Sequence, residues 1–186
     1  MNRILSTIYL ILTSCLCFCQ LPDSVQNEVN KRPNALDQLE YLDDLASQAL
    51  RANTDLHLEI VKAGITIAER TDNDSIANYF YIKAGTHYTY QNRFDTARMI
   101  FNKLLLNQSD QRLRAITFSE IGISYYYESN DTKALENFIR SFELYEQLGD
   151  TAKIAGITNN IGVIHRYLED YGSSNKFLMK AILIKN

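Results

Sequence analysis

An internal repeat constrains this chain more than any other feature. Three stretches align without a gap, and each carries a glycine, a small residue twelve positions later and a bulky apolar residue four positions after that. The three sets are Gly85, Ala97 and Phe101; Gly122, Ala134 and Phe138; and Gly162, Ser174 and Leu178. A repeat of this length predicts an array of similar units that pack on one another. Such an array offers an extended surface, whereas catalysis needs polar groups that converge on one point.

Apolar residues recur at helical spacing from Leu36 onward. In the run from residue 56 to residue 70, one helix face carries Leu58, Val61, Ile65 and Ala68. Short joints rich in Asp, Asn, Ser and Thr separate the runs, and these side chains can accept hydrogen bonds from the free N–H groups of a helix start. The joints cover residues 71–75, 107–110, 129–132 and 149–151. Joints this short predict an all-α chain of antiparallel neighbouring helices.

These residues resemble the tetratricopeptide repeat, a helix–turn–helix unit. In that family the first helix carries a Leu-Gly pair followed by a tyrosine, and the second carries Ala, then Phe or Tyr, then Ala. The matching first-helix residues are Ala84-Gly85 with Tyr88, Ile121-Gly122 with Tyr125, and Ile161-Gly162 with His165. The matching second-helix residues are Ala97, Phe101 and Leu104; Ala134, Phe138 and Ser141; and Ser174, Leu178 and Ala181. The resemblance implies a right-handed α-solenoid of antiparallel helix pairs with about four repeats.

The repeat glycines have a packing explanation. Glycine inside a helix costs about 1 kcal/mol relative to alanine, so we expect the second helix to approach each glycine closely, with the bulky residue filling the remaining space.

The resemblance covers residues 38–186 and divides them into repeats at about 38–71, 78–110, 115–149 and 155–186, the last incomplete. The first repeat is degenerate, because Leu45 stands at the glycine position, His57 at the first alanine and Gly64 at the last small position.

The composition limits the classes of partner and the compartment. Acidic residues number 22 and basic residues 19, and they are mixed along the chain, so we expect no binding to nucleic acid.

All three cysteines lie within residues 1–19. This segment is typical of an export signal, since Arg3 precedes an apolar run from Ile4 to Leu12 that is too short to cross a bilayer. Cleavage near Gln20 would leave a mature chain without cysteine, which excludes a disulfide scaffold.

A lipoprotein signal is the alternative interpretation of the same segment, and an uncleaved anchor is a third. The four residues that end at Cys15, Leu-Thr-Ser-Cys, resemble a bacterial lipobox, in which the cysteine is lipidated and becomes the N-terminus. Cleavage and lipidation both export the protein, to the periplasm or the membrane surface of a bacterium, and lipidation would tether its N-terminus to the membrane. Residues 20–37, which contain Pro22 and Pro33, are interpreted as a linker.

The resemblance also implies which residues meet a partner. In the family, the first helix of each repeat lines the concave face, and its non-packing positions contact ligands. The corresponding residues are Tyr79, Ile82 and Tyr90; Ser119, Ile123, Tyr126 and Tyr127; and Asn159, Val163, Arg166 and Tyr167. A tyrosine-rich groove can contact apolar side chains and still offer hydroxyl groups for hydrogen bonds. The alternatives are that a tyrosine packs on the neighbouring repeat and that Asn159, which adjoins Asn160, bridges helices.

No arrangement of residues in the sequence predicts catalysis or a cofactor. His57 and His165 occupy positions where the family places core residues, and no two histidines have the i, i+4 spacing of a zinc-binding helix. The glycine-rich loops that bind phosphate and the usual nucleophile motifs do not occur. We therefore expect a chain that is not an enzyme and that holds neither a metal nor a cofactor.

Two functional hypotheses remain. The first is a protein- or peptide-binding scaffold, the sensor or input part of a longer signalling protein. The second is a non-catalytic module of an enzyme such as a histidine kinase, whose catalytic domain lies outside this sequence. The final repeat supports both, because it has no polar capping helix and would expose an apolar patch to a following domain or a partner. The expected patch consists of Phe177, Leu178, Ala181 and Ile182.

Overall fold

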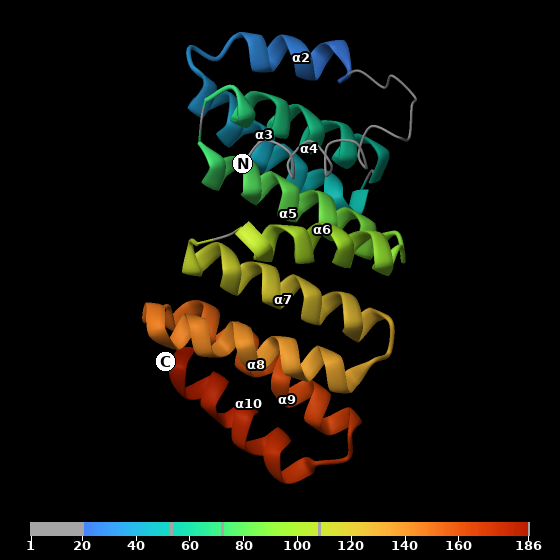
Figure 1. The fold of residues 1–186 in the computed structure, drawn as a ribbon, viewed down its shortest axis with the longest axis vertical. Coiled ribbons are helices and arrows are strands. Elements are labelled where there is room, and N and C mark those ends of the chain that lie inside the picture. Colours follow the sequence, from blue (N-terminus) through green and yellow to red (C-terminus); the bar gives the residue numbers. More distant parts are fainter. Residues whose placement is uncertain (1–20, 53, 72, 108, 186) are drawn as a thin grey trace. The chain divides into compact units, whose positions relative to one another are not determined.

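The computed structural model describes residues 21–52, 54–71, 73–107 and 109–185. Within these ranges the chain forms nine helices and no strand, so the predicted all-α class is confirmed there. The helices, drawn in Figure 1, are α2 (Asp23–Asn30), α3 (Ala35–Ala52), α4 (Thr54–Glu69), α5 (Asp74–Tyr90), α6 (Phe94–Asn107), α7 (Gln111–Tyr127), α8 (Asp131–Leu148), α9 (Thr151–Tyr167) and α10 (Tyr171–Lys185). The predicted export signal and Cys15 lie outside the described residues.

The chain divides into two compact units, each of which is described by itself. Unit 1 is Met1–His87 and unit 2 is Tyr88–Asn186. In unit 1, α2 packs on α3, and α3 packs on α4. In unit 2, each helix from α6 to α10 packs on the next one along the chain, as Figure 1 shows for α7 to α10. Packing between consecutive helices is compatible with a solenoid.

Polar residues of the predicted joints begin the helices. Asp110, Asn130 and Asp150 accept hydrogen bonds from backbone N–H groups in the first turns of α7, α8 and α9. Asn73 does the same at α5, and Asp170 at α10. A side-chain cap of this kind stabilises a helix by about 1 kcal/mol. The capping expected at the four joints is therefore confirmed.

The helices α5, α7 and α9 end in the same kind of turn. Each helix ends at a tyrosine, and the residue two positions later has a positive φ. These residues are Asn92 (57°), Ser129 (62°) and Glu169 (61°). At each turn the following N–H donates a hydrogen bond to the carbonyl five residues earlier, as in a Schellman motif. None of the three is glycine, so each side chain costs about 1 kcal/mol in this left-handed conformation.

The packing reason predicted for the repeat glycines is confirmed at two of them. A Cβ atom on Gly122 would lie 2.8 Å from the ring of Phe138, and one on Gly162 would lie 2.8 Å from Cγ of Leu178. Ser174 also donates a hydrogen bond from Oγ to the Gly162 carbonyl at 2.8 Å. In the α9–α10 pair, the small residue and the bulky residue of the repeat therefore both contact the glycine.

Gly64 on α4 has an even closer neighbour in unit 1. A Cβ atom there would lie 2.2 Å from the ring of Phe80 on α5. Phe80 is 1% exposed and belongs to the core of this unit. The sequence placed Gly64 at the last small position of the degenerate repeat, and the structure shows that this position receives an aromatic ring from the next helix.

Some predicted boundaries differ from those of the structure. The segment 20–37, expected to be a linker, contains α2 and the start of α3. Pro22 immediately precedes α2, where its missing N–H would have no helical partner, and Val29 is buried. Few apolar residues mark this helix, so its periodicity was too weak to predict it. Helices α5, α7 and α9 begin at Asp74, Gln111 and Thr151, four residues before the repeat starts expected at 78, 115 and 155.

The apolar patch expected on α10 is mostly wrong. The ring of Phe177 lies parallel to that of His165, with their centres 5.5 Å apart. Leu178 contacts Gly162, and Ala181 is 5% exposed. Only Ile182 of the expected residues is largely exposed, at 57%. The other three pack because the helix directs them onto α9, which supplies the facing glycine and imidazole.

Candidate functional site

Four tyrosines of unit 2 form a connected row. Tyr90, Tyr127 and Tyr167 are the terminal residues of α5, α7 and α9, and each lies five positions after a repeat glycine. The ring centres of Tyr90 and Tyr127 are 5.7 Å apart. Tyr126 continues the row, with its ring centre 5.9 Å from that of Tyr127 and 6.1 Å from that of Tyr167. We call these four residues the tyrosine row.

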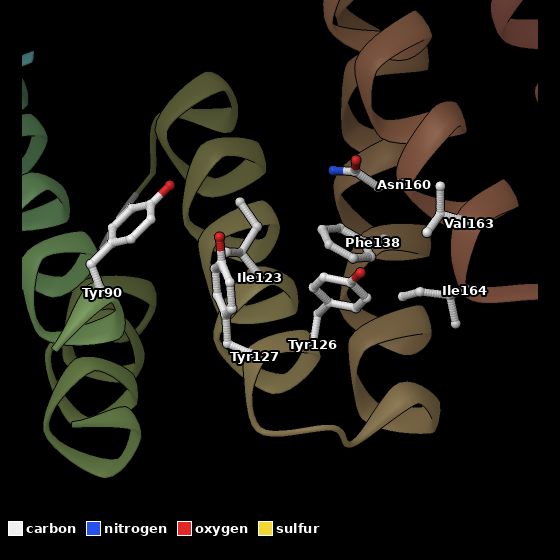
Figure 2. Close-up of a pocket in the computed structure, with 8 residues that line it drawn as sticks. All are labelled: Tyr90, Ile123, Tyr126, Tyr127, Phe138, Asn160, Val163 and Ile164. Carbon is white, nitrogen blue, oxygen red and sulfur yellow. The ribbon is translucent and has the colours of Figure 1, made fainter. Parts of the chain in front are cut away.

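An open pocket of about 320 Å³ lies along the tyrosine row. In Figure 2, Tyr126 and Tyr127 project from α7 between Tyr90 and the residues of α9. The lining residues are Tyr90, Ile123, Tyr126, Tyr127, Phe138, Asn160, Val163 and Ile164. Apolar and aromatic walls with a few polar groups are typical of sites that bind organic ligands. No lining residue carries a charged side chain at neutral pH.

The hydroxyl groups of the row give the pocket polar character. The pKa of Tyr126 is raised above its usual value, first because its side chain is hydrogen-bonded to Tyr167 and then because it is partly desolvated. Its phenol is therefore neutral at physiological pH and retains both donor and acceptor capacity. Asn160 adds an amide, which can donate to and accept from a peptide backbone. The pocket can thus hold an apolar side chain beside a polar chain.

The structure brings together half of the predicted site residues. Tyr90, Tyr126 and Tyr127 line the pocket, Tyr167 joins the row, and the predicted groove residues Ile123 and Val163 are also in the lining. Arg166 is exposed beside this group, with Cζ 5.6 Å from the centre of the Tyr167 ring.

Three other predicted residues lie elsewhere in the described structure. Ser119 is half-buried on α7, and Asn159 is exposed on α9, and the pocket lining includes neither. Tyr79 belongs to unit 1, where its ring lies edge-on to Phe80 with centres 6.2 Å apart. The Lys83 ammonium lies 5.2 Å from the centre of the Tyr79 ring. Tyr79 is half-buried and in contact with its own unit, as the packing alternative describes.

Sequence reasoning missed three lining residues, Phe138, Asn160 and Ile164. Asn160 could have been found, because it precedes Val163 by three residues and Tyr167 by seven and so shares their helix face. Asn159 points about one hundred degrees away on the helix, so the pocket lining contains Asn160 and not Asn159. Phe138 was assigned only to packing, although its ring serves both the Gly122 contact and the pocket wall.

The histidines of unit 1 form a buried pair. His57 and His87 are 2% and 5% exposed, and their Nδ1 atoms lie 3.3 Å apart with the rings nearly parallel, at 4°. Burial, followed by the nearby His87 and Lys83, lowers the pKa of His57 to about 4. The prediction that His57 occupies a core position is confirmed. At neutral pH one neutral ring can donate to the other.

Lys83 forms polar contacts within unit 1. Its ammonium lies 2.7 Å from Oδ1 of Asp43 and donates a hydrogen bond to Oγ of Ser47 at 3.0 Å.

Nowhere in the described ranges do three or more His, Cys, Asp or Glu side chains group as a metal site would require. No helix among the described residues is both long enough and apolar enough to span a membrane.

Comparison with known families and proteins gave no match. No protein-family model matches the chain, and no curated protein matches it. The tetratricopeptide resemblance stays a prediction carried by the residues quoted above.

Proposed function

We propose that this chain is a non-catalytic scaffold of the tetratricopeptide type that binds an extended peptide or protein segment along the tyrosine row. In this proposal the helix pairs form a right-handed solenoid of about four repeats. The observation that carries it is that three tyrosines at one repeat position, together with Tyr126, line or adjoin a single pocket. Tyrosine is enriched at binding surfaces because a rigid ring supplies contact area and its hydroxyl supplies a hydrogen bond.

The pocket chemistry supports a peptide as the ligand. A peptide needs apolar contact for its side chains and hydrogen-bond partners for its backbone. Ile123 and Val163 supply the first, and Asn160 with the tyrosine hydroxyls supplies the second. Arg166 at the edge offers a cation to an acidic side chain or a terminal carboxylate.

Selection from a random peptide library displayed on phage, with the full chain as bait, tests the proposal. Enriched peptides are then synthesised, and their affinities are measured for the wild type and for the double variant Tyr127→Ala/Arg166→Ala. We expect the double variant to lose about tenfold or more in affinity. The matched control is Tyr171→Ala, which removes a tyrosine 62% exposed outside the row. Equal affinities for the wild type and the double variant would reject the tyrosine row as the site.

We further propose that the chain is exported and acts as the input part of a longer signalling protein. Support comes from the sequence of residues 1–19 and from the resemblance to exported regions of bacterial sensors. The mass of the mature N-terminus separates cleavage near Gln20 from lipidation at Cys15. If Cys15 carries the lipid, the Cys15→Ser variant should no longer be found in the membrane fraction. An intact N-terminus in a cytoplasmic fraction would contradict export.

A further inference from the structure

Tyr126 on α7 and Tyr167 on α9 meet through their hydroxyl groups. Their side chains are hydrogen-bonded to each other, and the hydroxyl is the only polar group of a tyrosine side chain. The ring centres lie 6.1 Å apart, and the ring planes are tilted by 47°. The ring carbons next to each hydroxyl-bearing carbon therefore lie at the ends of the two rings that face each other.

An oxidant in solution can reach this pair of phenols. Tyr167 is 55% exposed, and Tyr126 is half-buried and lines the open pocket shown in Figure 2. Oxidants attack cysteine thiolates readily, but residues 20–186 contain no cysteine, and the whole chain contains no tryptophan. Within residues 20–186, the tyrosine phenols are therefore the side chains from which a single electron is most easily removed.

The rest of the tyrosine row connects to the pair. Tyr127 is 48% exposed, and its ring centre lies 5.9 Å from that of Tyr126 and 5.7 Å from that of Tyr90. Rings this close exchange an electron readily, so a radical formed on Tyr127 can move to Tyr126. Coupling of two radicals is irreversible, and it therefore removes radicals from the row at the pair whose hydroxyl groups meet.

We propose that Tyr126 and Tyr167 are a site of oxidative cross-linking, at which a haem peroxidase with hydrogen peroxide joins the two rings as dityrosine. Each phenol gives up one electron and its hydroxyl proton and becomes a tyrosyl radical. The radicals couple through a new C–C bond between carbons next to the hydroxyl-bearing carbons, and the hydrogen on each coupled carbon moves as a proton to the phenol oxygen. The two electrons and two protons released reduce one hydrogen peroxide to two water molecules. The cross-link does not depend on the peptide binding proposed above.

Treatment of the full chain with a haem peroxidase and hydrogen peroxide, followed by isolation of the monomer under reducing conditions, tests the proposal. We expect dityrosine fluorescence, and a tryptic cross-link between the peptides that hold Tyr126 and Tyr167, lighter than their sum by two hydrogen atoms. Tyr126→Phe and Tyr167→Phe should each lose most of the fluorescence, because phenylalanine has no hydroxyl to oxidise. Tyr171→Phe removes a phenol 62% exposed outside the row and should retain it.

Urea unfolding of the cross-linked monomer gives a second measurement. A covalent link between residues 126 and 167 restricts the unfolded chain, so a link that fits the native structure should raise the urea midpoint. Oxidation carried out in urea should no longer prefer this pair, and circular dichroism checks that each variant is folded. The proposal is overturned if the monomer contains no dityrosine, if the link joins other tyrosines such as Tyr90 and Tyr127, or if both phenylalanine variants keep the fluorescence. An unchanged or lowered urea midpoint also overturns it.

Discussion

The two units use one repeat position in different ways. Lys83 in unit 1 and Asn160 in unit 2 both lie two residues before a repeat glycine. Lys83 pairs with Asp43 and Ser47 within its own unit, and its charge is satisfied there. Asn160 instead faces an open pocket beside the tyrosine row. At this position the charge of Lys83 is neutralised by an ion pair and a hydrogen bond within unit 1. The neutral amide of Asn160 leaves hydrogen-bond capacity for a ligand.

The histidines of the two units also differ in burial. Unit 1 buries a histidine pair at 2% and 5% exposure, and the ring whose Nδ1 accepts the hydrogen bond must be neutral. In unit 2 the described histidine, His165, is half-buried and lies 3.2 Å from the carboxylate of Asp170. We therefore expect unit 1 to be the more acid-sensitive region, whereas unit 2 has the accessible polar pocket.

Acidification is expected to give the largest difference between the units. The folded-state pKa of His57 is lowered from 6.5 to about 4, so above pH 6.5 the residue is neutral in both the folded and unfolded states. Between those two values the unfolded chain binds more protons, and stability falls as the pH falls, by roughly 2–3 kcal/mol in total. Hydrogen exchange at pH 7.5 and pH 4.5 should show protection lost first in α4 and α5.

Variants at the histidines check the origin of this acid sensitivity. His57→Gln should flatten the dependence of unfolding free energy on pH, and His165→Gln should leave it in place. An undiminished slope in His57→Gln would assign the effect to other groups.

Alanine at the glycines compares packing tightness in the two units. Gly64→Ala places a Cβ 2.2 Å from the buried Phe80 ring and should destabilise the protein by about 2–3 kcal/mol. Gly162→Ala meets the more flexible Leu178 at 2.8 Å and should cost about 1 kcal/mol. Gly156 is exposed with no neighbour within 4 Å, so Gly156→Ala should stabilise by about 0.5–1 kcal/mol. Urea denaturation measures all three, and a cost for Gly156→Ala would undermine the comparison.

Substitution at the shared repeat position tests the central contrast. Lys83→Met leaves Asp43 without its counter-ion and should lower the free energy of unfolding by about 1–2 kcal/mol, discounted for partial exposure. Asn160→Ala should change stability by less than about 0.5 kcal/mol but weaken binding of a selected peptide. Lys31→Ala, which breaks an exposed pair with Glu28, is the matched control for charge removal. If Lys83→Met proved as neutral as Lys31→Ala, the ion pair would not distinguish unit 1.

The turns that end α7 and α9 should give the smallest effect. Ser129 and Glu169 have φ values of 62° and 61°, a conformation that glycine adopts without steric cost. Ser129→Gly and Glu169→Gly should therefore each raise the free energy of unfolding by about 0.5–1 kcal/mol. Thermal unfolding measures the gain, and Ser75→Gly, at an exposed site in the first turn of α5, is the control that should lower stability.

Much of the fold could be predicted because spacing encodes it. Gly122 predicted the close approach of Phe138, and Asp110 predicted a helix start. Helix α2 could not be predicted, since its few apolar residues give a weak period. The left-handed turn at Ser129 was also missed, because without glycine the sequence carries no local sign of it.

The site was predictable only at the level of helix faces. The first-helix positions that the resemblance implies included all four tyrosines of the row, and the structure shows them close to one pocket in unit 2. The same reasoning included Tyr79, which lies in unit 1 and contacts Lys83 and Phe80 there. It named Asn159, whereas the pocket is lined by Asn160, because one residue along a helix rotates the side chain by about 100°. Such choices depend on contacts between helices, which a single helix period does not determine.

The most direct test of the account is an NMR titration of the full chain, labelled on tyrosine, with a peptide selected from the library. The account predicts that signals of Tyr90, Tyr126, Tyr127 and Tyr167 shift together and saturate at the same peptide concentration, while those of Tyr79 and Tyr171 do not move. Shifts confined to Tyr79 or Tyr171, with the row unchanged, would contradict the claim that the tyrosine row of unit 2 is the binding surface.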